Sequence, residues 1–155
     1  IPTNTSVMDV LTISLAIPTF NRNDVLFESF KEVYDDPRIS SITIVDDASE
    51  IEIFEQVRQR SFSLPKIKLH RNLQNRDCYR NKYTALSLSD NDWNILLDSD
   101  NRIDKDYLDK IFQYQNLWDK NYILTPSFAS PHFDFRAYEG LIISKENVAE
   151  YIDKP

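Results

Sequence analysis

The feature that most constrains the fold is a regular alternation of short hydrophobic runs with helical patterns. Each run is long enough for one buried strand, and the hydrophobic residues between the runs recur at the spacing of amphipathic helices. Strands that alternate with helices pair in parallel, so the sequence predicts an α/β domain with a mostly parallel, doubly wound sheet flanked by helices. The expected strands are 11–17, 42–45, 66–70 and 93–97, and the expected helices are 23–34, 51–60, 77–88 and 104–117.

The C-terminal part of the chain carries weaker patterns. We expect a strand at 122–124, followed by an irregular, aromatic-rich segment at 126–138. The hydrophobic run 141–143 and a short helix beginning at Lys145 follow.

Polar clusters follow three of the expected strands. They occupy residues 18–22, 46–49 and 98–102. Because successive parallel strands run in the same direction, these three turns are expected at the same edge of the sheet. Open α/β sheets bind their ligands at this edge, so the three turns together predict a binding site.

The most informative cluster is the pair Asp98 and Asp100, which directly follows the run 93–97. Two carboxylates this close repel each other unless a cation or hydrogen-bond donors lie between them. Oxygen ligands of this kind suit Mg²⁺ or Mn²⁺, held by one or two carboxylates together with substrate phosphates. The pair therefore indicates a metal-assisted phosphate-ester site, with a solvated acidic turn as the alternative. The Asp-x-Asp triplets at 90–92 and 104–106 follow no expected strand.

Charge and glycine content limit the class of ligand. The formal net charge of −7 argues against general affinity for nucleic acid or for an anionic membrane surface. Gly140 is the only glycine, which excludes the glycine-rich loops that let backbone approach phosphate. A bound nucleotide would therefore be held by side chains and a metal.

The length of the chain limits the number of domains, and its cysteine content indicates the cellular compartment. The 155 residues fit one domain with a real core, so we expect an N-terminal extension (1–10) and a single domain (11–155). Cys78 is the only cysteine, which excludes an internal disulfide and favours a reducing, cytoplasmic compartment. Hydrophobic stretches long enough to span a bilayer are absent from the sequence.

Further polar residues are candidates for ligand contact. Asp46 and Asp47 end an expected strand together, and because adjacent strand residues point in opposite directions, we expect only one to face the ligand. Arg80 lies in an expected helix, where it could face a diphosphate, and Lys82 adds positive charge beside it. His132 could be a metal ligand or a proton shuttle, or a structural residue of its aromatic segment.

Four motifs in register resemble those of the family-2 glycosyltransferases of GT-A fold. They are Ile17–Arg22, Ile44–Ser49, Cys78–Lys82 and Leu96–Asn101. Their order and spacing are similar to the nucleotide-sugar-binding half of that family, over roughly residues 11 to 120. The resemblance implies a Rossmann-like GT-A domain, although the family usually has glycine at the position of Ala48.

The resemblance also implies roles for individual residues. Asp47 would hydrogen-bond the base, and Arg80 would reach the base or the phosphates. Asp98 would touch the ribose, while Asp100, with Asp98 as a second ligand, would coordinate Mn²⁺ or Mg²⁺. The implied nucleotide-sugar-binding residues are Pro18, Thr19, Phe20, Arg22, Asp47, Arg80, Asp98 and Ser99.

In the resembling family, the general base lies well beyond the metal motif. Asp134 and Glu139 are acidic and follow that motif, but neither lies in a base motif. We therefore expect the acceptor-binding segment to be short or missing, and the base either to lie outside these residues or to be one of these two.

The resulting hypothesis is a metal-assisted, inverting glycosyltransferase that moves a sugar from a nucleotide-diphospho-sugar, preferably a UDP-sugar, to a hydroxyl acceptor in glycan or polysaccharide synthesis. One alternative is a domain that binds a nucleotide-sugar, or another partner, without catalysis. A second is phosphoryl transfer with Asp98 as nucleophile, and a third is a receiver-like acidic pocket at Asp46 and Asp47.

Overall fold

The computed structural model describes residues 11–121, 123–129, 131, 133–134, 136–138 and 146–147. The chain divides into two compact units, Ile1–Gln115 and Asn116–Pro155. Within the described residues, no helix is long and apolar enough to cross a membrane.

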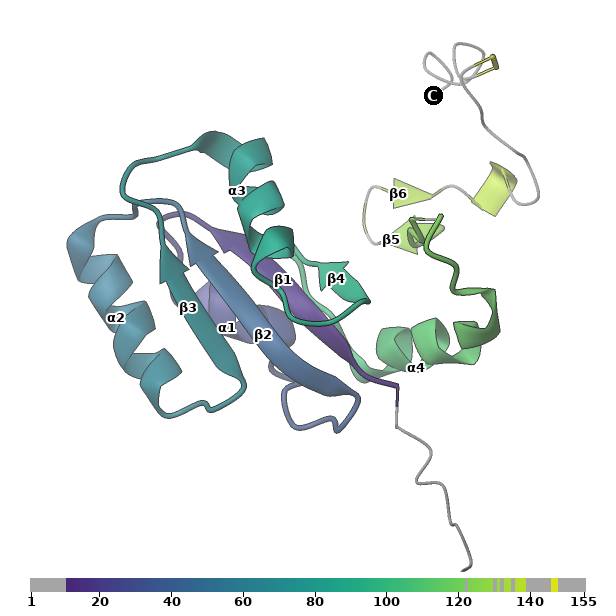
Figure 1. Cartoon of the computed structure of the whole chain (residues 1–155), viewed down its shortest axis with the longest axis horizontal. Coiled ribbons are helices and arrows are strands. Elements are labelled where there is room, and N and C mark those ends of the chain that lie inside the picture. The colour runs from purple at the N-terminus through teal and green to yellow at the C-terminus, as the bar shows by residue number, and fades with distance from the viewer. Residues whose placement is uncertain are drawn as a thin grey trace, which may run out of the picture. The chain divides into compact units, whose positions relative to one another are not determined.

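The first unit is a parallel α/β sheet with helices on both faces (Figure 1). The sheet has the strand order β3-β2-β1-β4, and every neighbouring pair is parallel. This arrangement confirms the expected fold class. The elements are β1 (Ile13–Thr19), α1 (Asp24–Phe30), β2 (Ile39–Asp46), α2 (Ile51–Phe62), β3 (Ile67–Arg71), α3 (Asp77–Ser87), β4 (Asn94–Leu96) and α4 (Lys105–Gln113).

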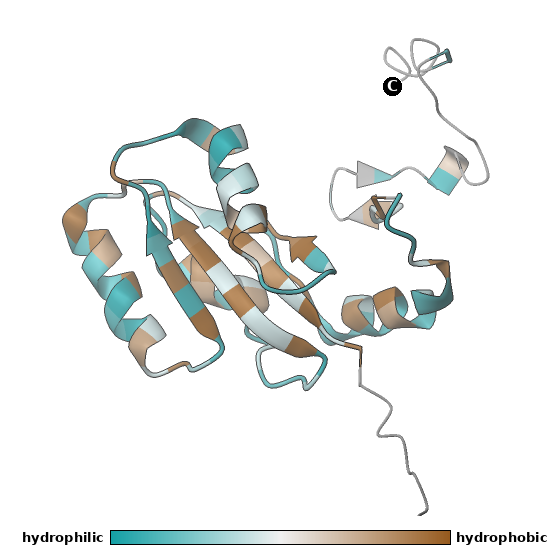
Figure 2. Ribbon diagram, in the orientation of Figure 1, coloured by the Kyte–Doolittle hydropathy of each residue, from teal (hydrophilic) through white to brown (hydrophobic). Residues whose placement is uncertain are grey.

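The hydrophobic core is built on the two central strands. All seven residues of β1 are buried, and in β2 only Ser40 is exposed. Strands of a parallel sheet covered on both faces are buried along their whole length, which explains the near-continuous isoleucine, leucine and valine of these runs. Figure 2 shows the hydrophobic residues concentrated in the strands.

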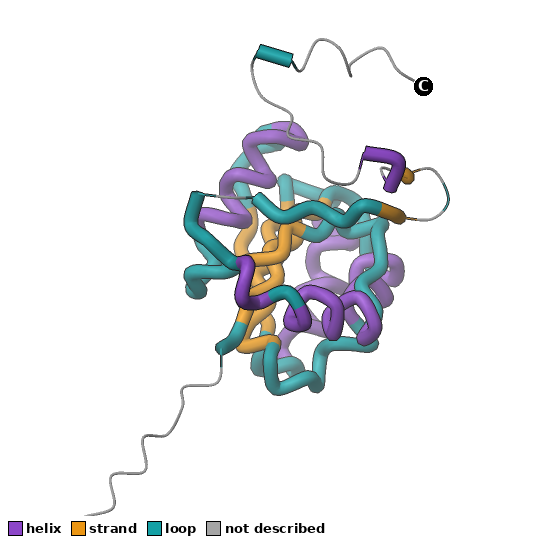
Figure 3. The backbone as a smooth tube through the Cα atoms, turned by 90° about the vertical axis from the view of Figure 1, so that its right-hand side faces the viewer, coloured by secondary structure: helices purple, strands orange, loops and turns teal. Residues whose placement is uncertain are grey.

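The helices cover the sheet according to the direction of each crossover. α1 and α2 connect strands that progress from β1 toward β3, whereas α3 leads back past β1 to β4. Because crossovers between parallel strands are right-handed, helices that connect strands in opposite directions along the sheet lie on opposite faces. Figure 1 accordingly shows α3 in front of the sheet and α1 behind it, and Figure 3 shows helices on both sides of the strands.

Strand register brings the polar strand ends together. Thr19, the last residue of β1, pairs with Asp46, the last residue of β2. On the other side of β1, Ala16 pairs with Leu96, and the Leu97 N–H donates to the Ala16 carbonyl at 3.0 Å. The three polar turns therefore leave the sheet at one edge, as predicted.

Some helix boundaries and faces differ from the predictions. α1 ends at Phe30, four residues before the expected end, and Val25 in this helix is 51% exposed. α4 begins where expected, because the Asp104 carboxylate caps it by accepting from the Tyr107 N–H at 2.7 Å. The helix was expected to reach residue 117 but ends at Gln113, and Leu117 is exposed in a separate 3₁₀ turn, Gln115–Leu117.

Residues 116–155 contain little regular structure where they are described. Two-residue strands β5 (Phe128–Ala129) and β6 (Phe133–Asp134) pair antiparallel, and a 3₁₀ turn spans Arg136–Tyr138.

The strand expected at 122–124 is wrong at its two described residues. Ile123 and Leu124 form no strand, and both side chains are exposed. Because both side chains are exposed to water, forming a strand here would bury no hydrophobic surface and would gain no hydrophobic stabilisation. The expected run 141–143 lies outside the described residues, as does the start of the expected terminal helix, of which only residues 146–147 are described, as a turn.

Candidate functional site

A cleft of about 290 Å³ lies at the carboxyl ends of β1, β2 and β4, beside the beginning of α3. It brings together every residue of the expected nucleotide-sugar-binding set except Arg80. Asp100, the expected metal ligand, also lines it. The described lining residues are Pro18, Thr19, Phe20, Arg22, Asp47, Asn75, Asp77, Cys78, Asn81, Lys82, Asp98, Ser99 and Asp100.

The loops after β1 and β2 are tied to each other. The Asn21 N–H donates to Ser49 Oγ at 2.7 Å, and the Glu50 N–H donates back to Asn21 Oδ1 at 2.8 Å. Asn21 and Ala48 hold left-handed backbone, with φ of 51° and 60°. This conformation is unfavourable for alanine, whereas asparagine adopts it more readily. The cross-links through Asn21 and Ser49 therefore help to hold Ala48 in this shape.

Asp46 and Asp47 have different surroundings, as adjacent residues at a strand end should. Asp46 is buried away from the cleft, where its carboxylate accepts bonds from the Ser49 N–H and hydroxyl. Asp47 is also buried but lines the cleft. Of this pair, Asp47 is therefore the residue that can meet a ligand.

A buried amide network holds one oxygen of Asp47. Asp47 Oδ1 accepts from Asn72 Nδ2 at 2.7 Å and from the Arg76 N–H at 2.9 Å. Asn72 Nδ2 also donates to Asn81 Oδ1 at 3.0 Å, and Asn81 Nδ2 donates to the Val45 carbonyl at 3.0 Å. Buried polar networks that are satisfied in this way rigidify their members, so the Asp47 carboxylate is fixed before any ligand arrives.

Asp98 is paired with a lysine from α3. Lys82 Nζ lies 2.8 Å from Asp98 Oδ1 and 3.0 Å from Oδ2. This hydrogen bond raises the pKa of Lys82 above its ordinary value, against the opposing effect of burial. The ammonium is therefore charged at any physiological pH.

Asp100 is paired with an arginine from the loop after β1. Arg22 Nη2 donates to Asp100 Oδ2 at 2.8 Å, and both side chains are partly exposed. Each acid of the Asp98–Asp100 pair thus has its own cation, which relieves the repulsion expected between them.

The cleft still has an excess of negative charge. Among its described lining residues, Asp47, Asp77, Asp98 and Asp100 are acidic, whereas only Arg22 and Lys82 are basic, a formal sum of −2. A diphosphate would add more negative charge, so a divalent cation would favour its binding.

The residues present fit a divalent metal that is shared with a ligand. Asp98 and Asp100 offer carboxylate oxygens, and the buried Thr19 hydroxyl in the cleft has no hydrogen-bond partner. Oxygen donors of this kind suit Mg²⁺ or Mn²⁺. No group of three or more His, Cys, Asp or Glu side chains in the described part of the chain could hold a metal. The remaining ligands would therefore be phosphate oxygens and water.

Helix geometry places Arg80 away from the cleft. Cys78 and Lys82, four residues apart on α3, both line the cleft, while Arg80, two residues from each, is exposed and absent from the lining. Residues two apart point to nearly opposite sides of a helix. Five lining residues were not among the expected site residues: Asn75, Asp77, Cys78, Asn81 and Lys82. The last three lie within the motif Cys78–Lys82, whose pattern could have indicated them.

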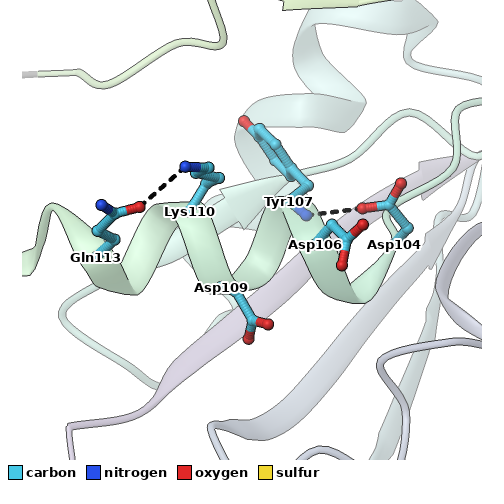
Figure 4. A pocket seen from close by; sticks show the side chains of 6 residues that line it. All are labelled: Asp104, Asp106, Tyr107, Asp109, Lys110 and Gln113. Carbon is cyan, nitrogen blue, oxygen red and sulfur yellow. Dashed lines mark hydrogen bonds between the residues drawn. The ribbon is translucent and has the colours of Figure 1, made fainter.

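A second hollow, of about 530 Å³, lies along α4 and carries no comparable arrangement (Figure 4). Three of its four charged lining side chains are engaged locally or structurally. Asp104 caps the helix, Lys110 donates to Gln113 at 3.1 Å, and Asp109 pairs with Arg38. This hollow contains no residue from the strand ends.

The candidate bases have less support. Asp134 is exposed, and its hydrogen bonds from Arg136 lower its pKa to about 2. A carboxylate with this pKa is a poor proton acceptor at neutral pH. Glu139 and His132 lie outside the described residues.

Fold and cleft together define a Rossmann-like α/β protein whose strand-end loops form the ligand site. The family model of glycosyl transferase family 2 matches residues 14–139, and the chain belongs to that family. No curated protein matches the chain.

Solved structures with the same fold confirm the expected GT-A architecture. The crystal structure of TarS from S. aureus matches with a TM-score of 0.58 and 21% identity, covering 69% of this chain and 20% of that one. Residues 1–349 of TarS in complex with UDP-GlcNAc match equally well, with 32% of that chain covered.

A mannosyltransferase, PcManGT from Pyrobaculum calidifontis, in complex with GDP-Man and Mn²⁺, matches with a TM-score of 0.50 and 20% identity. The match covers 57% of this chain and 27% of the mannosyltransferase. Across these structures, the chain spans between a fifth and a third of the length of its neighbours.

Proposed function

We propose that this chain forms the donor-binding part of a metal-assisted glycosyltransferase. Its donor is a nucleotide-diphospho-sugar, preferably a UDP-sugar, and its acceptor is a hydroxyl group. The observation that carries the proposal is the meeting of Asp47, Asp98 and Asp100 in one cleft at the ends of β2 and β4. Family membership and the donor complexes of the structural neighbours support it.

Two parts of the cleft would receive the nucleoside. Pro18, Thr19 and Phe20 would form one wall of the base pocket, and Phe20 presents an exposed ring on which a base can stack. Asp47, a buried carboxylate held at one oxygen by Asn72, would accept a hydrogen bond from the base. Asp98 would accept from a ribose hydroxyl.

The diphosphate would lie toward Asp100. Asp100, with Asp98 as a second ligand, would hold Mn²⁺ or Mg²⁺, and Arg22 and Ser99 would complete this part of the site. A bound divalent cation neutralises the negative charge that develops on the departing nucleoside diphosphate. Arg80 receives no contact in this proposal, because it lies on the other side of α3.

The proposed reaction is a single displacement with inversion at the anomeric carbon. The acceptor oxygen forms the new bond on one face of the sugar while the bond to the diphosphate breaks on the other, and a base takes the hydroxyl proton. Since Asp134 is held at a low pKa by Arg136, we assign the base to a residue other than Asp134.

Calorimetry with UDP and GDP tests donor binding. We expect the wild-type chain to bind one of them in the presence of Mn²⁺, and Asp100→Ala to weaken this binding by roughly tenfold or more, since it removes a charged ligand. Asp106→Ala is the matched control, because Asp106 belongs to another Asp-x-Asp triplet and lies on α4. Binding unaffected by Asp100→Ala would contradict the proposed site.

A binding domain without catalysis is the second candidate. Of the two candidate bases, only Asp134 lies at a described position, and its pairing with Arg136 makes it a poor base. A site without a base favours binding without catalysis. Transfer or hydrolysis assays with a panel of UDP- and GDP-sugars separate the two. Turnover supports the transferase, whereas tight donor binding without turnover on any acceptor supports the binding domain.

A further inference from the structure

We propose that Lys82 is the α3 residue that binds the donor diphosphate, and that it does so by exchanging Asp98 for phosphate oxygens. The inference rests on the proposed function and deepens it. It assigns to Lys82 the phosphate contact for which the motif had indicated Arg80.

The first support is position. Lys82 lies four residues after Cys78, on the side of α3 that faces the cleft, and its side chain is 27% exposed there. Arg80 is turned to the opposite side of the helix. Among the described lining residues, Lys82 is the one cation that α3 supplies. A diphosphate in the cleft can therefore reach Lys82 without any change in the helix.

The second support is the lability of its present partner. Lys82 Nζ contacts both oxygens of Asp98, but Asp98 is 40% exposed, so water can solvate the carboxylate once the ammonium leaves. Exposed and half-exposed ion pairs contribute little net free energy. The cost of separating Lys82 from Asp98 is therefore small compared with the attraction of an ammonium for a diphosphate.

The third support is the chemistry of lysine. Its ammonium is a compact charge with three donors on a flexible four-carbon chain, which suits an exchange of partners better than the rigid fork of arginine. The exchange also frees Asp98. The carboxylate that Lys82 neutralises in the empty cleft then becomes available to the ribose or to the metal. The same movement therefore brings Lys82 to the phosphates and frees Asp98 for its own ligand.

The test uses the whole chain and measures binding with Mn²⁺ and, separately, with EDTA. Under both conditions, pyrophosphate, UDP and uridine are titrated into the wild type, Lys82→Met, Lys82→Arg and Arg80→Met. We expect Lys82→Met to weaken pyrophosphate and UDP binding by about tenfold, the effect of losing a charged hydrogen bond. Uridine binding should stay unchanged, Lys82→Arg, which keeps the charge, should lose less affinity than Lys82→Met, and Arg80→Met should match the wild type.

Asp98→Asn provides a second measurement, because the affinity for pyrophosphate would not depend on Lys82 in this variant if the ion pair were purely structural. Because it releases the ammonium, it should raise pyrophosphate affinity about threefold or more, and this gain should vanish in Asp98→Asn combined with Lys82→Met. Thermal melting checks that each variant is folded, and if Lys82→Met is not, Lys82→Gln replaces it in both the single and the double variant.

The possible failures are distinguishable. If the wild type binds UDP and Lys82→Met binds it equally well, the assignment of Lys82 is overturned while the proposed function stands. If Arg80→Met loses affinity and Lys82→Met does not, Arg80 is the phosphate residue. If the wild type binds neither UDP, GDP nor pyrophosphate, with or without Mn²⁺, the proposed function and this inference both fall.

Discussion

Arg22 and Asp100, separated by 78 positions in the sequence, form a 2.8 Å ion pair that joins the loop after β1 to the loop after β4. The pair occupies the carboxylate that the metal is proposed to use. A cation and a metal cannot both neutralise the same carboxylate at no cost, so Arg22 competes with the metal in the empty cleft.

Removing Arg22 should therefore strengthen metal binding. We expect Arg22→Ala to raise the affinity for Mn²⁺, without nucleotide, by about two- to fivefold, since exposed ion pairs contribute roughly 0.2–1 kcal/mol. Calorimetry or the Mn²⁺ electron paramagnetic resonance signal measures it. Arg102→Ala is the control, because Arg102 pairs with Glu32 and neither residue lines the cleft. An unchanged affinity in Arg22→Ala would contradict the competition.

Ala48→Gly should stabilise the protein. Ala48 holds φ of 60°, which costs a residue with a Cβ atom about 1–2 kcal/mol, while glycine loses about 0.4–1 kcal/mol through greater freedom in the unfolded chain. The net gain is about 0.5–1 kcal/mol, or roughly 1–4 °C in melting temperature. Ala85→Gly, inside helix α3, should have the opposite sign. A lower melting temperature for Ala48→Gly would show that the loop tolerates Ala48 without strain.

Asn81→Ala should destabilise the fold and weaken donor binding together. Asn81 is buried, and its removal takes away the hydrogen bond to the Val45 carbonyl and leaves one Asn72 N–H without its acceptor. The expected loss is about 1–3 kcal/mol in urea unfolding. Asn101→Ala, at an exposed position, should change stability by less than about 0.5 kcal/mol. Equal effects of the two variants would mean that the network does not stabilise the fold.

The stability of the protein should depend on pH through Asp36. Its hydrogen bond from Arg38 lowers its pKa from 3.8 to about 2 in the folded protein. A lowered folded-state pKa stabilises the fold above the unfolded-state pKa, and this contribution disappears as the pH falls from about 4 toward 2. Asp36→Asn should therefore cost about 2 kcal/mol at pH 7 and much less near pH 2. Urea unfolding of both proteins across this range measures it, and a constant difference would exclude the mechanism.

The sheet and its polar edge could be predicted because they depend on local pattern. The runs around Leu15 and Ile44 are hydrophobic enough to require burial on both faces, and the polar turn after each run follows directly. Parallel pairing then places the turns together without further information. The expectation that only one of Asp46 and Asp47 faces the ligand rests on the same simple geometry of a strand.

The details of the site depend on tertiary structure and could not be predicted in this way. Arg80 and Lys82 lie on different sides of α3, and a motif of five residues does not show which side of the helix faces the cleft. The partners of Asp98 and Asp100 come from α3 and from the loop after β1, so their pairing requires the whole fold. The strand expected at 122–124 failed because hydrophobicity alone does not say whether a partner strand is present for Ile123.

Because β1 lies between β2 and β4, the short turn after β1 contacts the turns on both sides of it. Residues 20–23 border the neighbouring turn on either flank, through Asn21 with Ser49 on one and Arg22 with Asp100 on the other. A substitution in this turn should therefore disturb the proposed nucleoside and metal sites together, whereas changes near Ser49 or Asp100 should act on one flank. Engineering of donor preference should begin at the outer turns and leave residues 20–23 intact.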